Sequence, residues 1–149
     1  MKPQINFIHK TEGIQSLGDA HKTWIEKAVK AFNYSISELN FTFMSDEDLL
    51  QINKDYLNHD FYTDIITFDN TIGKVISADI AISYDRIKDN AKALGIDLNT
   101  ELNRVMIHGV LHCLGFQDHT EEEKKNMREL EDDMLNMFHV EHQKMNGNV

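Results

Sequence analysis

The sequence predicts an α+β fold in which a small mixed β-sheet of about four strands packs with five or so helices. Three observations lead to this fold class. The 149 residues are close to the commonest length of one compact domain. Apolar residues are spread along the whole chain, although they make up only 41% of it, which argues against extended disorder. Strand patterns come mainly before helical patterns, and we therefore expect residues 1–149 to form one α+β domain.

The first half of the chain is expected to alternate between strands and helices. Residues 4–8 are expected to form a short strand, and residues 24–32 carry apolar side chains at helical spacing. Apolar and polar residues alternate over residues 39–43, which is typical of a half-buried strand. Ser45 is the expected N-cap of the next helix, because the apolar residues after it recur at helical spacing: Leu49, Ile52 and Tyr56.

The second half begins with two β-rich runs, residues 65–68 and 75–83. The residues between them favour a turn, so we expect the two runs to form a hairpin. Residues 84–94 are then expected to form a helix that ends at Gly95.

The following helix, expected to begin at Asn99 or Thr100, is the most informative segment. Its apolar residues cover most of its circumference, which is typical of a helix buried in the middle of a domain. Gly115 is expected to end this helix. Thr120 and Glu123 then form the pattern of a capping box, which predicts a last helix with one apolar and one acidic face.

Composition limits the compartment and the partners of the protein. Cys113 is the only cysteine, so no intrachain disulfide can form, and no secretory leader is recognisable; a cytoplasmic location is expected. No stretch approaches the roughly 18 to 20 apolar residues of a membrane-spanning helix, and we expect no membrane partner. The formal net charge of −10 opposes general adhesion to nucleic acid, although a local basic groove stays open as an alternative.

Residues 108–119, HGVLHCLGFQDH, hold three of the eight histidines. His108 and His112 are four residues apart, so on a helix their rings face the same side. Gly115 lets the chain turn back, and the short loop after it can bring His119 to the same point. Three imidazoles leave a fourth coordination position open for water, which is typical of catalytic metal sites.

We therefore predict that His108, His112 and His119 bind one divalent metal ion that activates water for hydrolysis. The alternative is that they are ordinary core or helix-end histidines. Burying polar rings without strong partners costs on the order of 1 to 3 kcal/mol each, so a buried helix gains nothing from such a pair without a ligand. Neutral imidazoles favour zinc over magnesium, while nickel, copper and cobalt stay open.

The residues beside the expected ligands bear on the type of hydrolysis. Metallopeptidases with an H-E-x-x-H helix carry a glutamate as general base after the first histidine, but here that position is Gly109. Asp118 adjoins the third expected ligand and is a candidate catalytic base or a group that orients an imidazole. Its alternative role is to cap the last helix, and both alternatives stay open.

The histidine segment resembles the pattern H-G-x-L-H-x-x-G-x-D-H of the YbeY family of endoribonucleases. Two upstream segments strengthen the resemblance, in the same order and at the same spacing. Residues 52–68, INKDYLNHDFYTDIITF, resemble the family's L-N-x-x-Y-R-x-x-D-x-P-T-D-V-L-S-F, and residues 78–83, ADIAIS, resemble G-D-I-x-I-S. The resemblance covers most of the chain.

This resemblance implies a zinc-dependent, single-strand-specific endoribonuclease that takes part in small-subunit rRNA maturation and ribosome quality control. The implied substrate is rRNA precursor, the further partners are the ribosome or small-subunit proteins, and no DNA is expected. It also implies that His108, His112 and His119 hold one zinc ion per chain.

The chain departs from the family pattern at the arginine that is expected to face the scissile phosphate, because this position is Leu57. A guanidinium stabilises charge that grows on phosphate oxygens, and a leucine cannot do so. Either Lys54, His59 or Arg104 substitutes for it, or phosphate chemistry is weaker in this protein.

Asp64 and Asp79 complete the set of expected substrate-binding residues. Asp64 lies in the matched segment with Asp60 and Thr63, for which capping of a loop is the alternative role. Asp79 interrupts an apolar strand and needs a partner if it is buried. Its alternative is an edge-strand aspartate that faces water.

Two other functions remain open at this point. One is a metal-dependent hydrolase of peptides or amides, suggested by the histidine helix and opposed by Gly109. The other is a non-catalytic, ribosome-associated factor in which the metal only stabilises the fold, suggested by Leu57 and the acidic surface.

Overall fold

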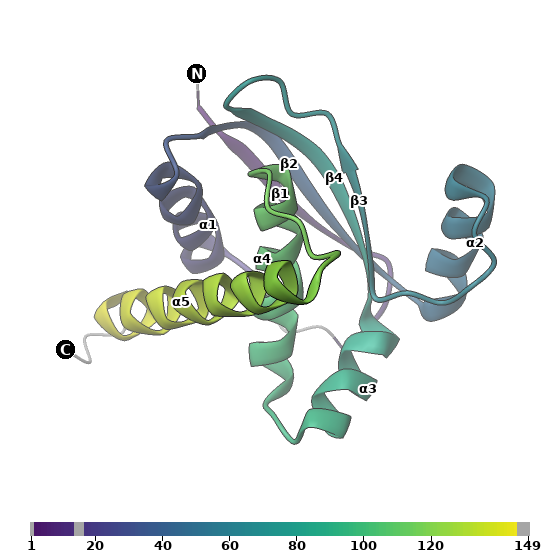
Figure 1. Cartoon of the computed structure of the whole chain (residues 1–149). Helices are drawn as coiled ribbons and strands as arrows, with labels where there is room; N and C mark the ends of the chain where they lie inside the picture. The colour runs from purple at the N-terminus through teal and green to yellow at the C-terminus, as the bar shows by residue number, and fades with distance from the viewer. Residues whose placement is uncertain (1, 14–16, 146–149) are drawn as a thin grey trace.

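The computed structural model describes residues 2–13 and 17–145 and has the expected α+β architecture (Figure 1). In these residues, four strands and five helices follow one another in the order β1 (Gln4–His9), α1 (Asp19–Ala31), β2 (Ser35–Met44), α2 (Asp46–Leu57), β3 (Ile65–Asp69), β4 (Val75–Ser83), α3 (Tyr84–Leu94), α4 (Leu98–Cys113) and α5 (Glu121–Met145). The predicted fold class and the predicted strands and helices are confirmed, with shifts of a few residues at the ends.

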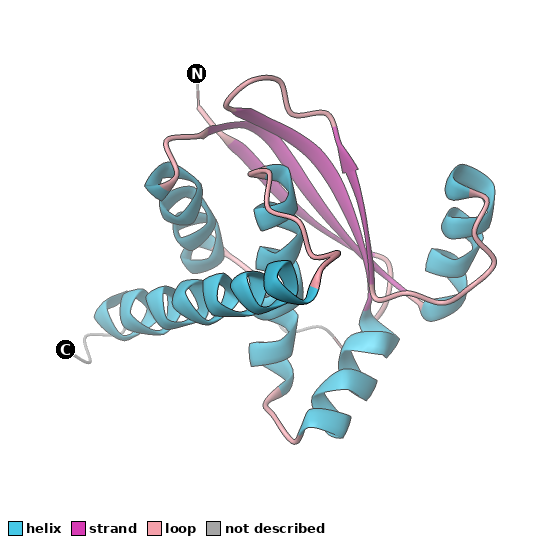
Figure 2. Ribbon diagram, in the orientation of Figure 1, coloured by secondary structure: helices cyan, strands magenta, loops and turns pink. Residues whose placement is uncertain are grey.

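The four strands form one mixed sheet in the order β1-β2-β4-β3 (Figure 2). β1 and β4 each pair in parallel with β2, whereas β3 and β4 form the predicted antiparallel hairpin. β4 is therefore a central strand. The alternative in which Asp79 lies on an edge strand is wrong, because β2 pairs with the other side of β4 and places Asn40 opposite Asp79.

The two faces of the sheet carry different layers of helices. α1, α4 and α5 pack together on one face, and α2 lies on the other face, as Figure 1 shows. A small apolar cluster holds α2 against β3 and β4; its buried members are Met44, Leu49, Ile66 and Ala81. Among the described helices, none is long and apolar enough to cross a lipid bilayer.

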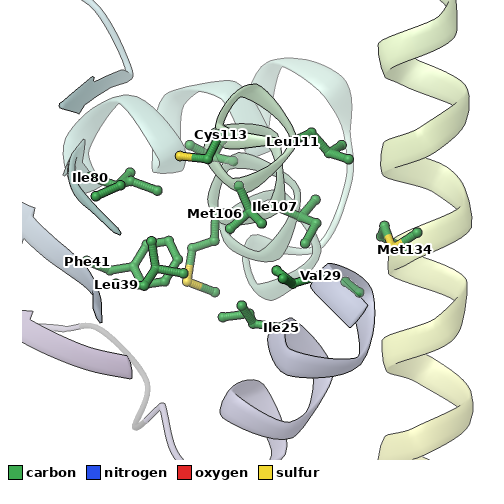
Figure 3. Packing of buried hydrophobic residues seen from close by; sticks show 14 of the residues in the cluster. Ile25, Val29, Leu39, Phe41, Ile80, Met106, Ile107, Leu111, Cys113 and Met134 are labelled. Carbon is green, nitrogen blue, oxygen red and sulfur yellow. The ribbon is translucent and has the colours of Figure 1, made fainter. Parts of the chain in front are cut away.

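α4 is the predicted buried helix, and it lies between α1, α5 and the sheet. Figure 3 shows its side chains Met106, Ile107, Leu111 and Cys113 among those of the neighbouring elements. The helix comes close to the sheet at Gly109, where a Cβ atom would lie 2.9 Å from Cδ1 of Ile80. It begins slightly earlier than expected, at Leu98, because the carbonyl of Asp97 already accepts a hydrogen bond from the N–H of Glu101.

The predicted helix ends are also confirmed. The hydroxyl of Ser45 accepts a hydrogen bond from the N–H of Asp48 at 3.1 Å. Gly95 ends α3 in the left-handed conformation, with φ of 66°. Thr120 and Glu123 form the reciprocal capping box at the start of α5, with distances of 2.9 and 3.0 Å between donor and acceptor atoms.

Candidate metal centre

His108 and His112 lie on the same side of α4, near its C-terminal end. Their Nε2 atoms are 3.0 Å apart, and their ring planes are nearly perpendicular, at 82°. Both side chains are partly buried, with relative exposures of 22% and 26%. The spacing of four residues thus brings two imidazoles to one point on the helix surface, and their role as metal ligands stays a prediction.

Asp118, and not His119, completes this group in the structure. One possible ligand atom from each of His108, His112 and Asp118 lies within 4.8 Å of the others. The Oδ2 atom of Asp118 is 3.3 Å from Nε2 of His108 and 3.6 Å from Nε2 of His112.

The side chain of His119 is exposed and lies outside this group. The expected convergence of three imidazoles is therefore not what the structure shows. The backbone N–H of His119 donates to Oε1 of Glu123 at 3.1 Å, which fixes this residue in the capping box of α5. Because the chain enters that box directly after Asp118, the aspartate faces the two histidines and His119 faces solvent.

Hydrogen bonds at Nδ1 orient both imidazoles. Nδ1 of His112 lies 2.9 Å from the carbonyl oxygen of Phe116, which can only accept, so this nitrogen carries the proton. Nδ1 of His108 lies 2.7 Å from Oε2 of Glu131, which places its proton in the same way. In the neutral rings both Nε2 atoms then present lone pairs to the same point, beside the Asp118 carboxylate.

The two Nε2 lone pairs and the carboxylate oxygen repel one another at these distances unless a proton or a metal cation lies between them. Two imidazoles and one carboxylate are ligands that catalytic zinc sites use, and manganese and iron also accept this set. The residues present therefore fit a divalent metal ion.

Glu131 is the buried partner that positions His108. Its side chain is 7% exposed, and its Oε1 accepts a hydrogen bond from Arg104 at 3.0 Å. Burial by itself lowers the pKa of His108, but the hydrogen bond to Glu131 and the charges of Glu131 and Asp118 outweigh it, so the pKa is raised. Sequence reasoning missed Glu131. The available signal was a carboxylate at helical spacing from the buried Met127 and Met134 of α5.

The three donor residues line a cleft of about 390 Å³ between α2, β3 and α4. Leu57, at the position of the missing arginine, also lines this cleft, as do His59 and Asp64. Burial raises the pKa of Asp64, and the attraction of His108 only partly offsets this effect.

Lys54 and Arg104, two of the expected substitutes for the arginine, do not line this cleft. Lys54 lies 3.4 Å from the carboxylate of Asp60. The guanidinium of Arg104 lies 3.0 Å from both Glu131 and Asp132, beside a separate cavity of about 190 Å³. His59 is therefore the one expected substitute that the structure brings to this cleft.

The side chain of Asp79 is exposed and is not among those that line the cleft. Its Oδ1 accepts a hydrogen bond from Nδ2 of Asn40 at 2.9 Å, and Asn40 in turn accepts one from Asn6 at 2.8 Å. The aspartate thus belongs to a polar row across β1, β2 and β4, and the structure does not support its expected role in the RNA site.

Cys113 follows His112 on α4 but points into the core, where it is 4% exposed. Burial raises the pKa of its thiol to about 12. We expect Ellman's reagent to leave Cys113 unmodified in the folded protein at pH 8 and to modify it fully in denaturant. Rapid modification of the folded protein would contradict this burial.

Comparison with known proteins places the chain in a family. A sequence model of the family described as endoribonuclease YbeY matches residues 4–139. The chain belongs to the YbeY family. Among its relatives, the protein named endoribonuclease YbeY of Christiangramia forsetii is 44% identical over 140 residues, which cover 94% of this chain and 98% of that protein. The one of Cytophaga hutchinsonii is 51% identical over 117 residues, which cover 78% of this chain and 82% of that protein.

A solved structure supports the fold independently. The solution structure of TM1509 from Thermotoga maritima has a TM-score of 0.69 to this chain, with 22% sequence identity. The match covers 95% of this chain and 93% of TM1509. At this identity the likeness establishes the fold alone, and the chemistry of the site has to be argued from its side chains.

The YbeY pattern and the structure together explain the position of Asp118. In the pattern H-G-x-L-H-x-x-G-x-D-H the last histidine stands ten residues after the first. This chain has two residues between Gly115 and Asp118 where the pattern has one, so the residue ten positions after His108 is Asp118 (118 − 108 = 10). Counting from the first histidine, rather than matching the letters D-H, would have predicted the aspartate.

Proposed function

We propose that this YbeY-family protein is a metal-dependent endoribonuclease that hydrolyses single-stranded RNA, with one divalent ion held by His108, His112 and Asp118. The observation that carries the proposal is the convergence of two Nε2 atoms and one carboxylate at a cleft that is open to solvent. The family supplies the class of reaction, since its members are named endoribonucleases.

A bound ion would supply Lewis-acid activation of water and polarisation of the scissile phosphate. The residues of the chain provide the rest. Glu131 and the Phe116 carbonyl hold the imidazoles in one orientation. Outside the ligand set, His59 and Asp64 are the titratable side chains that line the cleft, and we assign them to the phosphate and to proton movement.

Zinc remains the first candidate for the metal, with manganese, iron and cobalt as alternatives because a carboxylate replaces the third imidazole. As finer parts of the proposal, the substrate is rRNA precursor, the setting is small-subunit rRNA maturation and quality control in the cytoplasm, and the ribosome or its small-subunit proteins are partners.

The peptidase alternative loses support for a steric reason. Gly109 stands where an H-E-x-x-H site has its general base, and a Cβ there would lie 2.9 Å from Cδ1 of Ile80 and 3.0 Å from Cδ1 of Ile65, so a glutamate would require these side chains to shift. No observation in the described residues favours the non-catalytic alternative.

Removal of the metal tests this proposal. Chelator-treated protein should cut a single-stranded RNA at background rate, and addition of zinc, manganese or cobalt should restore cleavage. Metal content measured in the same samples should approach one ion per chain in the active ones. Full activity in protein verified to be free of metal would refute the proposal. Fold stabilisation by metal without any RNA cleavage would favour the non-catalytic factor.

A further inference from the structure

We propose that the stacked rings of His59 and Phe61 form a platform on which an unpaired RNA base stacks beside the metal centre. The two ring centroids are 5.0 Å apart and their planes differ by 21°. Both residues line the same cleft as the three donor residues, and Phe61 is 55% exposed. The inference rests on the proposed function, because it names how that site recognises a single strand.

The loop that carries the two rings is held in place before any ligand arrives. Asn53 of α2 is 2% exposed and binds this loop at two points. Its carbonyl accepts a hydrogen bond from the N–H of His59 at 3.0 Å, and its Nδ2 donates to the carbonyl of Phe61 at 2.8 Å. Asn58, the C-cap of α2, adopts the left-handed conformation, with φ of 56°, and turns the chain from α2 into this loop. A preformed platform spares the entropy of ordering a loop on binding.

Two neighbouring aromatic residues, Tyr62 and Tyr56, are held by contacts within the fold. The hydroxyl of Tyr62 donates to Glu47 at 2.5 Å, and its ring lies under Arg86. Tyr56 packs edge-on against Phe68. The ring of Phe61 stacks on His59 and is more than half exposed where it lines the cleft, so it keeps surface available to a ligand.

Charge favours stacking over phosphate contacts as the source of affinity. The chain has a formal net charge of −10, Leu57 stands in the arginine position, and Lys54 and Arg104 are engaged by carboxylates. A base in a duplex is covered on both faces by its neighbours, whereas an unpaired base can stack on an aromatic ring whatever its identity. The platform therefore selects unpaired strands with little dependence on sequence.

The test is the binding of a short single-stranded RNA containing 2-aminopurine, whose fluorescence is quenched by stacking, to the full chain in the presence of chelator. Wild type should quench the probe, and Phe61→Ala should weaken binding about 10-fold and remove most of the quenching. Phe61→Trp should retain both, whereas Phe61→Leu should behave like the alanine variant because it lacks a ring face. Leu94→Ala, at an exposed apolar residue of similar exposure (57%) on α3, should match wild type.

Cleavage by the metal-loaded enzyme gives an independent readout. Phe61→Ala should raise the KM for single-stranded RNA about 10-fold and leave kcat within a few fold, because the platform acts in binding. Equal binding, quenching and KM in wild type and Phe61→Ala would overturn the platform. If wild type still cleaves RNA in that case, the proposed function stands. Absence of quenching by wild type would likewise overturn the platform. Failure of the proposed function would instead appear as absent cleavage by metal-loaded wild type.

Discussion

Asp118→Ala should abolish metal binding and RNA cleavage, whereas His119→Ala should leave both close to wild type. The Asp118 carboxylate lies 3.3 and 3.6 Å from the two Nε2 atoms, and its loss would remove one of the three proposed ligands and the only charged one among them. Metal affinity should therefore fall by more than the roughly 10- to 100-fold that loss of an outer hydrogen-bond partner costs. Titration of metal-free protein with cobalt, followed by its visible spectrum, measures the affinity directly.

The adjacent pair of residues provides a matched control for this prediction. His119 is exposed, and the hydrogen bond that it contributes to the capping box comes from its backbone N–H, which alanine retains. Asp118→His should bind the metal again, because it restores the histidine that the YbeY pattern has ten residues after the first one. If His119→Ala were as inactive as His112→Ala while Asp118→Ala stayed active, the ligand set drawn from the structure would be wrong.

Glu131→Ala should lower the free energy of unfolding by about 1.5 to 3 kcal/mol, because it removes a buried carboxylate that accepts a charged hydrogen bond from Arg104, while Asp132 and Glu101 still face the guanidinium. The side chains of Arg104 and Glu131 are only 16% and 7% exposed, so solvent compensates little for the loss. Asp132→Ala is the matched control. It removes a second carboxylate from the same guanidinium at the same distance of 3.0 Å, but Asp132 is 58% exposed, and the expected cost is below about 1 kcal/mol. Urea denaturation of the metal-free variants measures both.

Glu131→Gln separates the effect on the metal centre from the effect on stability. A glutamine keeps the size of the side chain and an oxygen acceptor for Nδ1 of His108. It removes the negative charge that makes the Nε2 atom of this imidazole a stronger electron-pair donor to a metal. Metal affinity should fall about 10- to 100-fold in a protein that remains folded. Wild-type metal affinity in folded Glu131→Gln would show that the carboxylate supports only the fold.

The strands and helices could be predicted because their signals are local. The alternation in residues 39–43 and the caps at Ser45, Gly95 and Thr120 are set by neighbours in the sequence, and each lies where expected. The order of the strands is set by contacts between distant segments. For this reason the sequence did not reveal that β4 lies between β2 and β3, and an edge strand stayed open as one of two alternatives for Asp79.

The same distinction separates the predicted from the unpredicted parts of the metal centre. His108 and His112 come together because helical geometry places residues four apart on the same side of the helix. Whether Asp118 or His119 turns inward depends on one extra loop residue and on the capping box that follows. Glu131 is 23 residues from His108 in the sequence and contacts it because α5 packs on α4. The spacing of apolar residues within α4 does not indicate a partner on another helix.

All three proposed ligands lie within residues 108–118, whereas the carboxylate that aligns the first of them belongs to α5. The carbonyl of Met134 on α5 also accepts a hydrogen bond from the indole of Trp24 at 2.7 Å, so α5 connects α1 to α4. Transient detachment of α5 would keep all three proposed ligands, but the imidazole of His108 would lose the carboxylate that orients it. The enzyme would then lose metal affinity before it loses its sheet, and a chain cut ahead of α5 would keep every ligand yet bind the ion weakly.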